Sequence, residues 1–490
     1  MKKAGFNPSA LFAASEQGAW YDPSDMSTLF QDAAGTTPCY QPGQGQVDPP
    51  VGLLLDKRLG LTRGPELVSN GEFSDGTAGW STSSSYQSSA AAVGGGMQVT
   101  STAAFGRQVS PVSLTVGKTY VLTGKARAEG GATARLQVGT ISTGGDSGAF
   151  VAVLTTSSIQ TFGRIVFTAT AAQMYVAAGS TSVGAVTYFD AISIKELPGN
   201  HAFQATTTSR PALSARYNLL TATDTLTTQS VTTVATSYTL KLTGAGSVTL
   251  SGTAAGSYSA GTYTITCTAG SLTLTVSGSV TQADLRPAND GAGLPPYQRV
   301  VDATTYDTAG FPLYLRFDGV DDFLQTANVD FSGAGKVLVS AALRKTSDAS
   351  AAIVVELSAD MGTNNGAFYL AFPRSSSVNE PMFGSRGTLF AVAMDNSTLW
   401  PAPISIVLTG IGDISGDKAI RRVNGALSLT ITGDQGTGTY GNYPLYIGRR
   451  AGTSLSFNGR LYGLLIRGAA TPDATIATVE RHLNSKARIY

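Results

Sequence analysis

Apolar and polar residues alternate with a period of two along much of the chain from residue 110 to residue 470. The clearest stretches are 237–243 and 271–276, and Gly, Ser and Asn separate such stretches from one another. A period of two places successive side chains on opposite faces of a strand, so one face of each sheet is expected to be buried. The sequence therefore predicts an all-β fold made of several antiparallel β-sandwiches.

One stretch near the C-terminus has helical spacing instead. Ile476, Val479 and Leu483 form an i, i+3, i+7 stripe, and Thr471-Pro472 before them suits the start of a helix. The sequence therefore predicts one C-terminal helix that docks on a sheet through this stripe.

The composition excludes several classes of protein. Only 13% of the 490 residues are charged, and 33 Lys and Arg against 32 Asp and Glu leave a net charge of +1, which gives no reason to expect binding to nucleic acid or to an acidic membrane. His201 and His482 are the only histidines, so multi-histidine metal sites and Ser-His-Asp hydrolases are disfavoured. Residues 145–148 (Gly-Asp-Ser-Gly) match the nucleophile tetrapeptide of chymotrypsin-like proteases, but we interpret them as a turn. We therefore expect that the protein is not an enzyme.

Targeting signals and cysteines narrow the picture further. No stretch reaches the roughly 18 apolar residues of a membrane span, and residues 1–15 lack the apolar run of about 7 that a secretion signal needs. Release inside a virus particle at lysis is one route for such a protein. Cys39 and Cys267 make no disulfide framework, and Cys267 alternates with threonines, so we interpret it as a core thiol.

Two regions resemble known sandwich modules. Residues 70–80, which end in Gly79-Trp80, and residues 188–194, which begin Tyr188-Phe189-Asp190, resemble the first and last strands of jelly-roll carbohydrate-binding modules. The region from 313 to 490 resembles concanavalin-like, laminin-G-like sandwiches in four stretches, which are 315–324, 422–425, 445–448 and 457–463.

Residues 20–25 and 29–38 resemble the beginning of tailed-bacteriophage virion proteins that are described as tail-fibre or tail proteins. In that group a sequence like 55–57 continues directly into one like 199–202, whereas here the path is interrupted twice. Insertions into surface loops cost little, because loop-closure entropy grows slowly with length. The resemblance implies nested parts, which are an N-terminal attachment segment (1–17), a concanavalin-like sandwich (18–57, 199–217 and 311–490), a carbohydrate-binding-module-like jelly roll (58–198), a small β-sandwich insertion (218–300) and a linker (301–310).

The same resemblance implies a structural protein of the bacteriophage virion, of the tail-fibre or receptor-binding type. It would present its modules on the particle surface for adhesion to host polysaccharide or lipopolysaccharide, after assembly in the host cytoplasm. Other virion subunits are the expected partners, and a homotrimer is the expected oligomer. The alternatives are a capsid or tail decoration protein with a purely structural role, and a polysaccharide depolymerase. The depolymerase is disfavoured because no carboxylate pair stands in a recognisable catalytic motif.

Aromatic residues are the candidate glycan contacts, because sugar rings stack on flat faces through their C–H groups. Most aromatic residues of sandwiches lie in the core, which is the alternative for each of them. Tyr440 and Tyr443 flank Gly441-Asn442 and are expected on a loop. The full set of candidates is Trp80, Tyr86, Tyr188, Trp400, Tyr440 and Tyr443.

Carboxylates give two further candidates. Glu72 and Asp190 match the positions of a structural calcium site in jelly-roll binding modules, and carboxylate oxygens suit Ca²⁺. The sequence requires no cofactor, and this Ca²⁺ is the one that the resemblance implies. Asp318, Asp321 and Asp322 are interpreted as turn residues, with calcium or glycan contact as the alternative.

Two remaining features concern contacts with other molecules. The pairs Arg421-Arg422 and Arg449-Arg450 are interpreted as solvated charges on a sheet edge, with an anionic polysaccharide or an acidic subunit as the alternative partner. The first 18 residues have no periodicity long enough for a domain, so Phe6, Leu11 and Phe12 are expected to anchor the chain to a neighbouring subunit.

Overall fold

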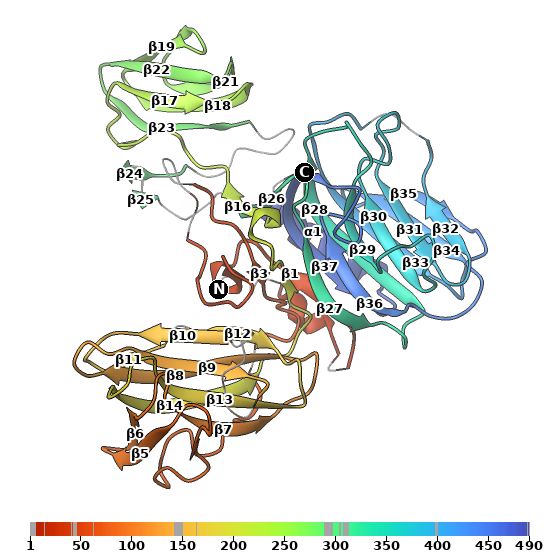
Figure 1. Cartoon of the computed structure of the whole chain (residues 1–490). Helices are drawn as coiled ribbons and strands as arrows, with labels where there is room; N and C mark the ends of the chain where they lie inside the picture. Colours follow the sequence, from red (N-terminus) through yellow and green to blue (C-terminus); the bar gives the residue numbers. More distant parts are fainter. Residues whose placement is uncertain are drawn as a thin grey trace.

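The chain folds into three β-sandwich lobes and one C-terminal α-helix in the computed structural model (Figure 1). The all-β class and the single C-terminal helix are confirmed for the residues that the structure describes. These residues are 6–13, 15–40, 42, 47–61, 63–141, 150–162, 164–288, 297–302, 305–306, 313–396, 400–487 and 489. The tetrapeptide 145–148, interpreted above as a turn, and most of the predicted linker 301–310 lie outside them.

The large sandwich consists of two antiparallel sheets. We call the first the helix sheet. Its eight strands are β16 (Ala212–Ala215), β26 (Leu313–Asp318), β37 (Asn458–Arg467), β28 (Lys336–Lys345), β33 (Ile404–Asp413), β34 (Lys418–Val423) and β35 (Ala426–Ile431), in this order, with β1 (Gly18–Tyr21) also paired to β37.

We call the second sheet of the large sandwich the junction sheet, because the jelly roll meets it. Its nine strands are, in order, β2 (Leu29–Phe30), β3 (Leu53–Leu54), β15 (Ala202–Phe203), β27 (Leu324–Asp330), β36 (Asn442–Ile447), β29 (Ile353–Leu357), β30 (Ala367–Ala371), β31 (Met382–Arg386) and β32 (Phe390–Ala393). The described residues also form the short 3₁₀ turns η1 (Pro8–Leu11), η2 (Met26–Thr28) and η3 (Thr207–Ser209).

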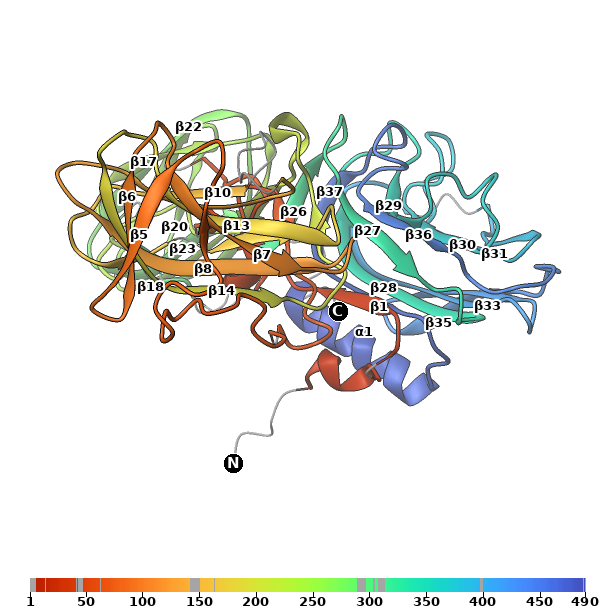
Figure 2. The same cartoon turned by 60° about the horizontal axis from the view of Figure 1, so that its bottom comes forward.

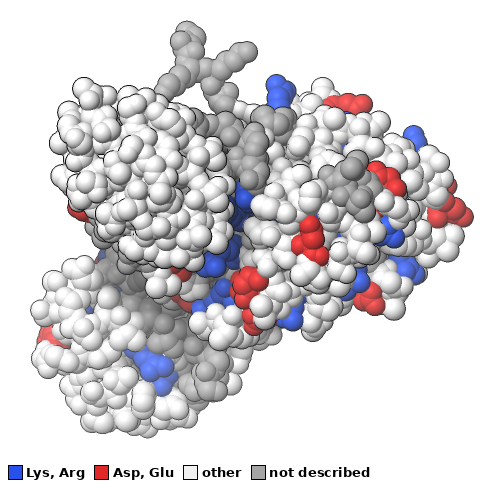
Figure 3. All heavy atoms as spheres, turned by 90° about the horizontal axis from the view of Figure 1, so that it is seen from above, with Lys and Arg blue, Asp and Glu red and all other residues white. Residues whose placement is uncertain are grey.

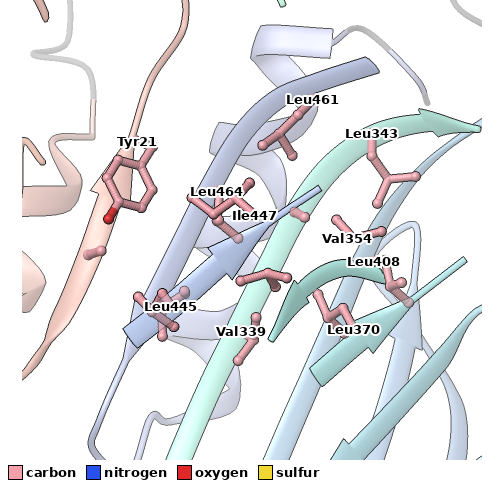
Figure 4. Packing of buried hydrophobic residues seen from close by; sticks show 14 of the residues in the cluster. Tyr21, Val339, Leu343, Val354, Leu370, Leu408, Leu445, Ile447, Leu461 and Leu464 are labelled. Atoms are coloured by element: carbon pink, nitrogen blue, oxygen red, sulfur yellow. The ribbon is translucent and has the colours of Figure 1, made fainter. Parts of the chain in front are cut away.

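The core of the large sandwich lies between these two sheets (Figure 4). Alternate residues of β28 and β37, such as Val339 and Leu464, point inward and meet Val354, Leu370 and Ile447 of the junction sheet. All five side chains are 1% exposed or less. Burial of such apolar surface is the main favourable contribution to folding.

The chain leaves the large sandwich after β3 and returns in β15, which pairs directly with β3 through Ala202 and Leu54. Asp56 lies at this crossing and is fully buried. Its carboxylate accepts the N–H groups of Trp20 (2.9 Å), Arg58 (2.9 Å) and Asn200 (2.8 Å). Asp56 thereby joins the first strand of the large sandwich to both ends of the interruption.

The first interruption is the jelly roll, which also has two sheets. One sheet has the strand order β11 (Gln160–Thr161), β8 (Thr119–Ala128), β14 (Val186–Glu196), β6 (Gly96–Ser101) and β5 (Ser88–Val93), with β12 (Ile165–Thr168) also paired to β8. The other, which we call the site sheet, has the order β10 (Phe150–Leu154), β9 (Ala134–Gly139), β13 (Gln173–Ser180), β7 (Arg107–Ser113) and β4 (Ser81–Thr82).

The second interruption begins after β16 and ends before β26. It is the small sandwich, which has two sheets. One has the strand order β17 (Gln229–Thr233), β22 (Gly270–Ser277), β19 (Ser247–Gly252) and β20 (Gly256–Tyr258). The other has the order β21 (Gly261–Cys267), β18 (Thr236–Gly244) and β23 (Val280–Pro287). A two-stranded ribbon of β24 (Val300–Asp302) and β25 (Thr305–Tyr306) follows. Cys267 is a buried free thiol in the core of the small sandwich, as predicted, and Cys39 is free and buried as well.

Helix α1 (Asp473–Ala487) covers the outer face of the helix sheet, and the predicted stripe of Ile476, Val479 and Leu483 is buried against it. The N-terminal turn lies beside α1 (Figure 2). Phe6, Leu11 and Phe12 are partly buried in the same apolar cluster. Part of their apolar surface therefore packs against their own chain, and their role as anchors to a neighbouring subunit stays a prediction.

Charge is sparse on the surface. Seen from above, much of the molecule carries neither basic nor acidic side chains, and Lys and Arg gather in the crevice between the lobes (Figure 3). Among the described residues, no helix has the length and the apolar character needed to cross a bilayer.

Candidate functional site

Two arginines stand together on the outer face of the site sheet in the jelly roll. Arg107 on β7 and Arg135 on β9 are both opposite Gly179 of β13. Cross-strand partners point to the same face of a sheet, so both guanidinium groups rise on the same side of Gly179. A Cβ atom at Gly179 would lie 2.1 Å from the backbone oxygen of Gly106, so the close approach of β7 requires glycine there.

Two aromatic rings complete this cluster. The guanidinium carbon of Arg107 lies 4.0 Å from the ring centroid of Tyr86, and that of Arg135 lies 5.9 Å from the ring centroid of Phe105. The two rings meet edge to face, with their centroids 6.4 Å apart. Phe105 is 43% exposed. The cluster therefore places aromatic surface beside positive charge.

Hydrogen bonds hold the two arginines in position. The Nε–H of Arg107 donates to the Phe105 carbonyl (2.9 Å), and the Nε–H of Arg135 donates to Oε1 of Gln137 (2.8 Å). Burial, and then the positive charge of Arg135, lower the pKa of Arg107. An anion between the two groups would relieve this repulsion.

The pocket that these residues line has a volume of about 10 Å³. This is room for a single water-sized group such as one carboxylate oxygen. Any sugar bound here would therefore lie mainly on the surface and insert one polar group.

Sequence reasoning found one residue of this cluster, Tyr86, and missed the others. Arg135 and Gln137 have the period of two that marks an outward face, but the pairing of β9 and β7 with β13 is a long-range event. Phe105 lies in a turn before β7 and has a positive φ of 59°. The outward spacing of Arg135 and Gln137 in β9 was the available signal.

The other two aromatic candidates in the jelly roll are corrected. Trp80 is 8% exposed and packs against Phe73 in the core, with ring centroids 5.6 Å apart. Tyr188 is 7% exposed, and its hydroxyl donates to the Gly94 carbonyl at 3.2 Å. Neither side chain presents a ring face on which a sugar could stack.

The aromatic candidates of the large sandwich are not gathered into a site. Tyr440 is fully buried, and its hydroxyl is hydrogen-bonded to the Ser385 hydroxyl at 2.6 Å, so its assignment to glycan binding is wrong. Burial raises its pKa well above the ordinary value. Tyr443 is half-buried and donates to the Asn365 carbonyl at 3.1 Å, and Trp400 packs partly buried against the core.

The candidate calcium ligands lie on adjoining segments. The Ile192 N–H donates to the Gly71 carbonyl at 3.0 Å, which places the chain around Glu72 beside the chain around Asp190. Asp190 accepts the N–H of Ala191 at 2.8 Å, and Glu72 is exposed. Two carboxylates and nearby carbonyls fit the hard ligands of Ca²⁺, and the site stays a prediction.

Asp318, Asp321 and Asp322 form a compact acidic cluster, with one carboxylate oxygen of each within 4.8 Å of the others. Asp318 accepts the N–H of Val320 at 2.7 Å and therefore shapes the turn, as the sequence interpretation had it. Asp322 is 8% exposed. Its burial, and then the negative charge of Asp318, raise its pKa to about 7.

This pKa predicts a pH-dependent stability. Because the folded protein holds the Asp322 proton more tightly than the unfolded chain, whose Asp pKa is about 3.9, the contribution is complete below about pH 4 and is lost as the pH rises through about 7. The side chain in Asp322→Asn cannot ionise, so this variant does not lose that contribution. Relative to the wild type, its free energy of unfolding should therefore increase as the pH rises between these values. Urea unfolding at pH values below and above this window measures the difference. An equal difference at both would show that Asp322 ionises normally.

No protein-family model matches the chain, and no curated protein sequence matches it. Parts of the chain are similar to solved structures. A structure described as "CBM4 structure and function" is 17% identical, with 26% of this chain and 99% of that chain covered and a TM-score of 0.23. The CBM40 of a Ruminococcus gnavus IT-sialidase is 14% identical, with 34% and 96% covered and a TM-score of 0.26. The NanB sialidase from Streptococcus pneumoniae, as its K499G mutant, is 15% identical, with 34% and 27% covered and a TM-score of 0.25.

Proposed function

We propose that this protein is a non-enzymatic component of a bacteriophage particle that adheres to acidic glycans on the bacterial surface. The cluster of Tyr86, Phe105, Arg107 and Arg135 is the observation that supports adhesion most directly. The resemblance of residues 20–25 and 29–38 to tail proteins supports the location on a virion tail.

The mechanism follows from the shallow form of the site. A sugar ring would stack on Phe105 and Tyr86, and its carboxylate would accept hydrogen bonds from the two guanidinium groups. One such contact is weak, but many copies on one particle convert weak binding into firm attachment through effective concentration. A symmetric homo-oligomer, with a trimer as the proposed form, would present several sites together. A structural Ca²⁺ at Glu72 and Asp190 would stabilise the same module.

The test is binding of the purified full chain to an array of acidic and neutral oligosaccharides. We expect binding to acidic glycans, and a loss of about tenfold or more in Arg135→Ala, because a hydrogen bond to a charged group contributes roughly 1.5–3 kcal/mol. Arg127→Ala is the matched control, since Arg127 lies on the other sheet and pairs with the exposed Glu129.

Two outcomes would contradict the proposal. If no glycan binds, a structural role in the particle is the better description. If the chain releases reducing ends from capsule or lipopolysaccharide, the protein is a depolymerase.

A further inference from the structure

A cleft of about 890 Å³ lies where the jelly roll meets the junction sheet. Its volume falls within the range of roughly 300–1,000 Å³ that is typical of small-molecule sites. One side is formed by Phe203 of β15, Asn328 and Asp330 of β27, and Asn442 of β36. Because Asp330 is directly opposite Asn442, and Asn328 precedes Asp330 by two residues, these three polar side chains share the outer face of the sheet.

The opposite side belongs to the jelly roll. It consists of the turn from Val116 to Thr119, before and at the start of β8, of Thr168 at the end of β12, and of Thr170 two residues after it. Val116 is 58% exposed although it is apolar. The Gly117 N–H donates to the Ala169 carbonyl at 2.9 Å, so the two segments of this wall are joined to each other.

Contacts between the jelly roll and the junction sheet join the two walls of the cleft. Phe30 and Leu53 of the junction sheet pack with Val121 and Val166 of the jelly roll in one buried apolar cluster. The Val166 N–H also donates to the Ala34 carbonyl at 2.5 Å. A ligand would therefore enter a preformed cleft and would bear little of the cost of ordering it.

Two polar groups of the cleft, Arg210 and the imidazole of His201, are occupied by their own chain. Arg210 donates to the carbonyls of Gln204, Gln31 and Ala205, at distances from 2.9 to 3.0 Å. His201 accepts the Asp56 N–H at 2.9 Å through Nδ1 and donates from Nε2 to the Leu197 carbonyl at 3.1 Å. These groups build the cleft and contribute little to recognition.

The exposed polar groups of the cleft have a different character. Asn328, Asp330 and Asn442 are exposed to solvent, and Phe203 is half-buried beside them. Ser332 donates its backbone N–H to Asp330 at 2.9 Å, and its hydrogen bonds lower the pKa of that carboxyl. Sugar hydroxyls can donate to this carboxylate and can exchange hydrogen bonds with both amides, and Lys118 of the opposite wall pairs with Glu196 at 3.5 Å.

We propose that this cleft binds a neutral oligosaccharide, with its ring against Phe203 and its hydroxyls on Asn328, Asp330 and Asn442. The inference rests on the proposed adhesion function and extends it, because it gives the protein a second sugar site, for neutral rather than acidic sugars. The acidic site of the jelly roll and the neutral site of the cleft would recognise different parts of a surface polysaccharide.

Isothermal titration of the full chain with maltohexaose, cellohexaose and chitohexaose, and with trigalacturonate as the acidic probe, tests this inference. We expect at least one neutral probe to bind, and binding to weaken about tenfold or more in Asp330→Ala, since hydrogen bonds to a charged group are lost. Ala327→Trp fills the cleft from an exposed strand position and should abolish neutral binding. Ala426→Trp, at an exposed position of β35 and outside the cleft, is the matched control. Unchanged thermal unfolding of each variant confirms that it is folded.

The outcomes separate the two sites. Neutral binding that survives Arg135→Ala and is lost in Ala327→Trp supports the cleft. Neutral binding that is lost in Arg135→Ala and retained in Ala327→Trp, or binding of no neutral probe, overturns the cleft and leaves the acidic site standing. Loss of trigalacturonate binding in Ala327→Trp but not in Arg135→Ala would overturn the division into an acidic and a neutral site. Failure of trigalacturonate to bind while a neutral probe binds would count against the jelly-roll site alone.

Discussion

Replacing Asp56 with alanine is expected to lower the free energy of unfolding by about 3–5 kcal/mol, because the carboxylate is fully buried and pairs with Arg58. The substitution also removes the acceptor for the backbone N–H groups of Trp20 and Asn200. Each buried donor left without a partner costs roughly 1–3 kcal/mol, and the costs are not additive. The affected groups come from three separate stretches of the chain. The substitution is therefore expected to destabilise the contacts at the point where the jelly roll interrupts the large sandwich.

Urea unfolding of the full chain measures this effect. Asp75→Ala is the matched control, because Asp75 is exposed in a turn, and we expect it to change stability by less than about 0.5 kcal/mol. Asp56→Asn keeps one oxygen but places an amide donor among backbone donors, so it should destabilise nearly as much as alanine. A loss of less than about 1 kcal/mol in Asp56→Ala would show that other contacts hold the crossing.

The second large effect is expected at Arg421, which sequence reasoning interpreted as a surface charge. Instead, Arg421 is fully buried. Its Nη1 donates to Glu380 at 3.1 Å and to the Pro381 carbonyl at 2.6 Å, and its Nη2 donates to Asp395 at 2.9 Å. Its neighbour Arg422 pairs with the buried Glu480 of α1 at 2.8 Å. The interpretation of this pair as solvated edge charges is corrected, and neither guanidinium is free for a polysaccharide.

Arg421→Met should therefore destabilise the protein by about 3–5 kcal/mol, since it leaves the fully buried Glu380 with less positive charge around it. The double variant Arg421→Met with Glu380→Gln removes the buried charge as well. We expect its loss to be clearly smaller than the sum of the two single losses, because a buried ion pair is costly mainly when one partner is missing. Additive losses in denaturant unfolding would show that the two side chains act independently.

The sequence alone was sufficient for features that depend on local spacing. The period of two in residues 237–243 and 271–276 predicted strands, and both stretches lie within β18 and β22. The spacing of Ile476, Val479 and Leu483 predicted the docked face of α1. Period and spacing report which face of an element is buried, and this information is contained in the neighbouring residues.

Only the tertiary structure decided which of the exposed-looking residues are accessible and which side chains meet. Tyr440 lies next to Gly441 and Asn442, yet it is buried, because its ring packs against that of Phe368 and its hydroxyl is hydrogen-bonded to the Ser385 hydroxyl. Arg107 and Arg135 come close together because β7 and β9 pair with opposite edges of the same strand, β13. Asn328 and Val116 line one cleft because the jelly roll contacts the junction sheet. Strand pairing and lobe contacts join residues far apart in sequence, and a local pattern carries no information about them.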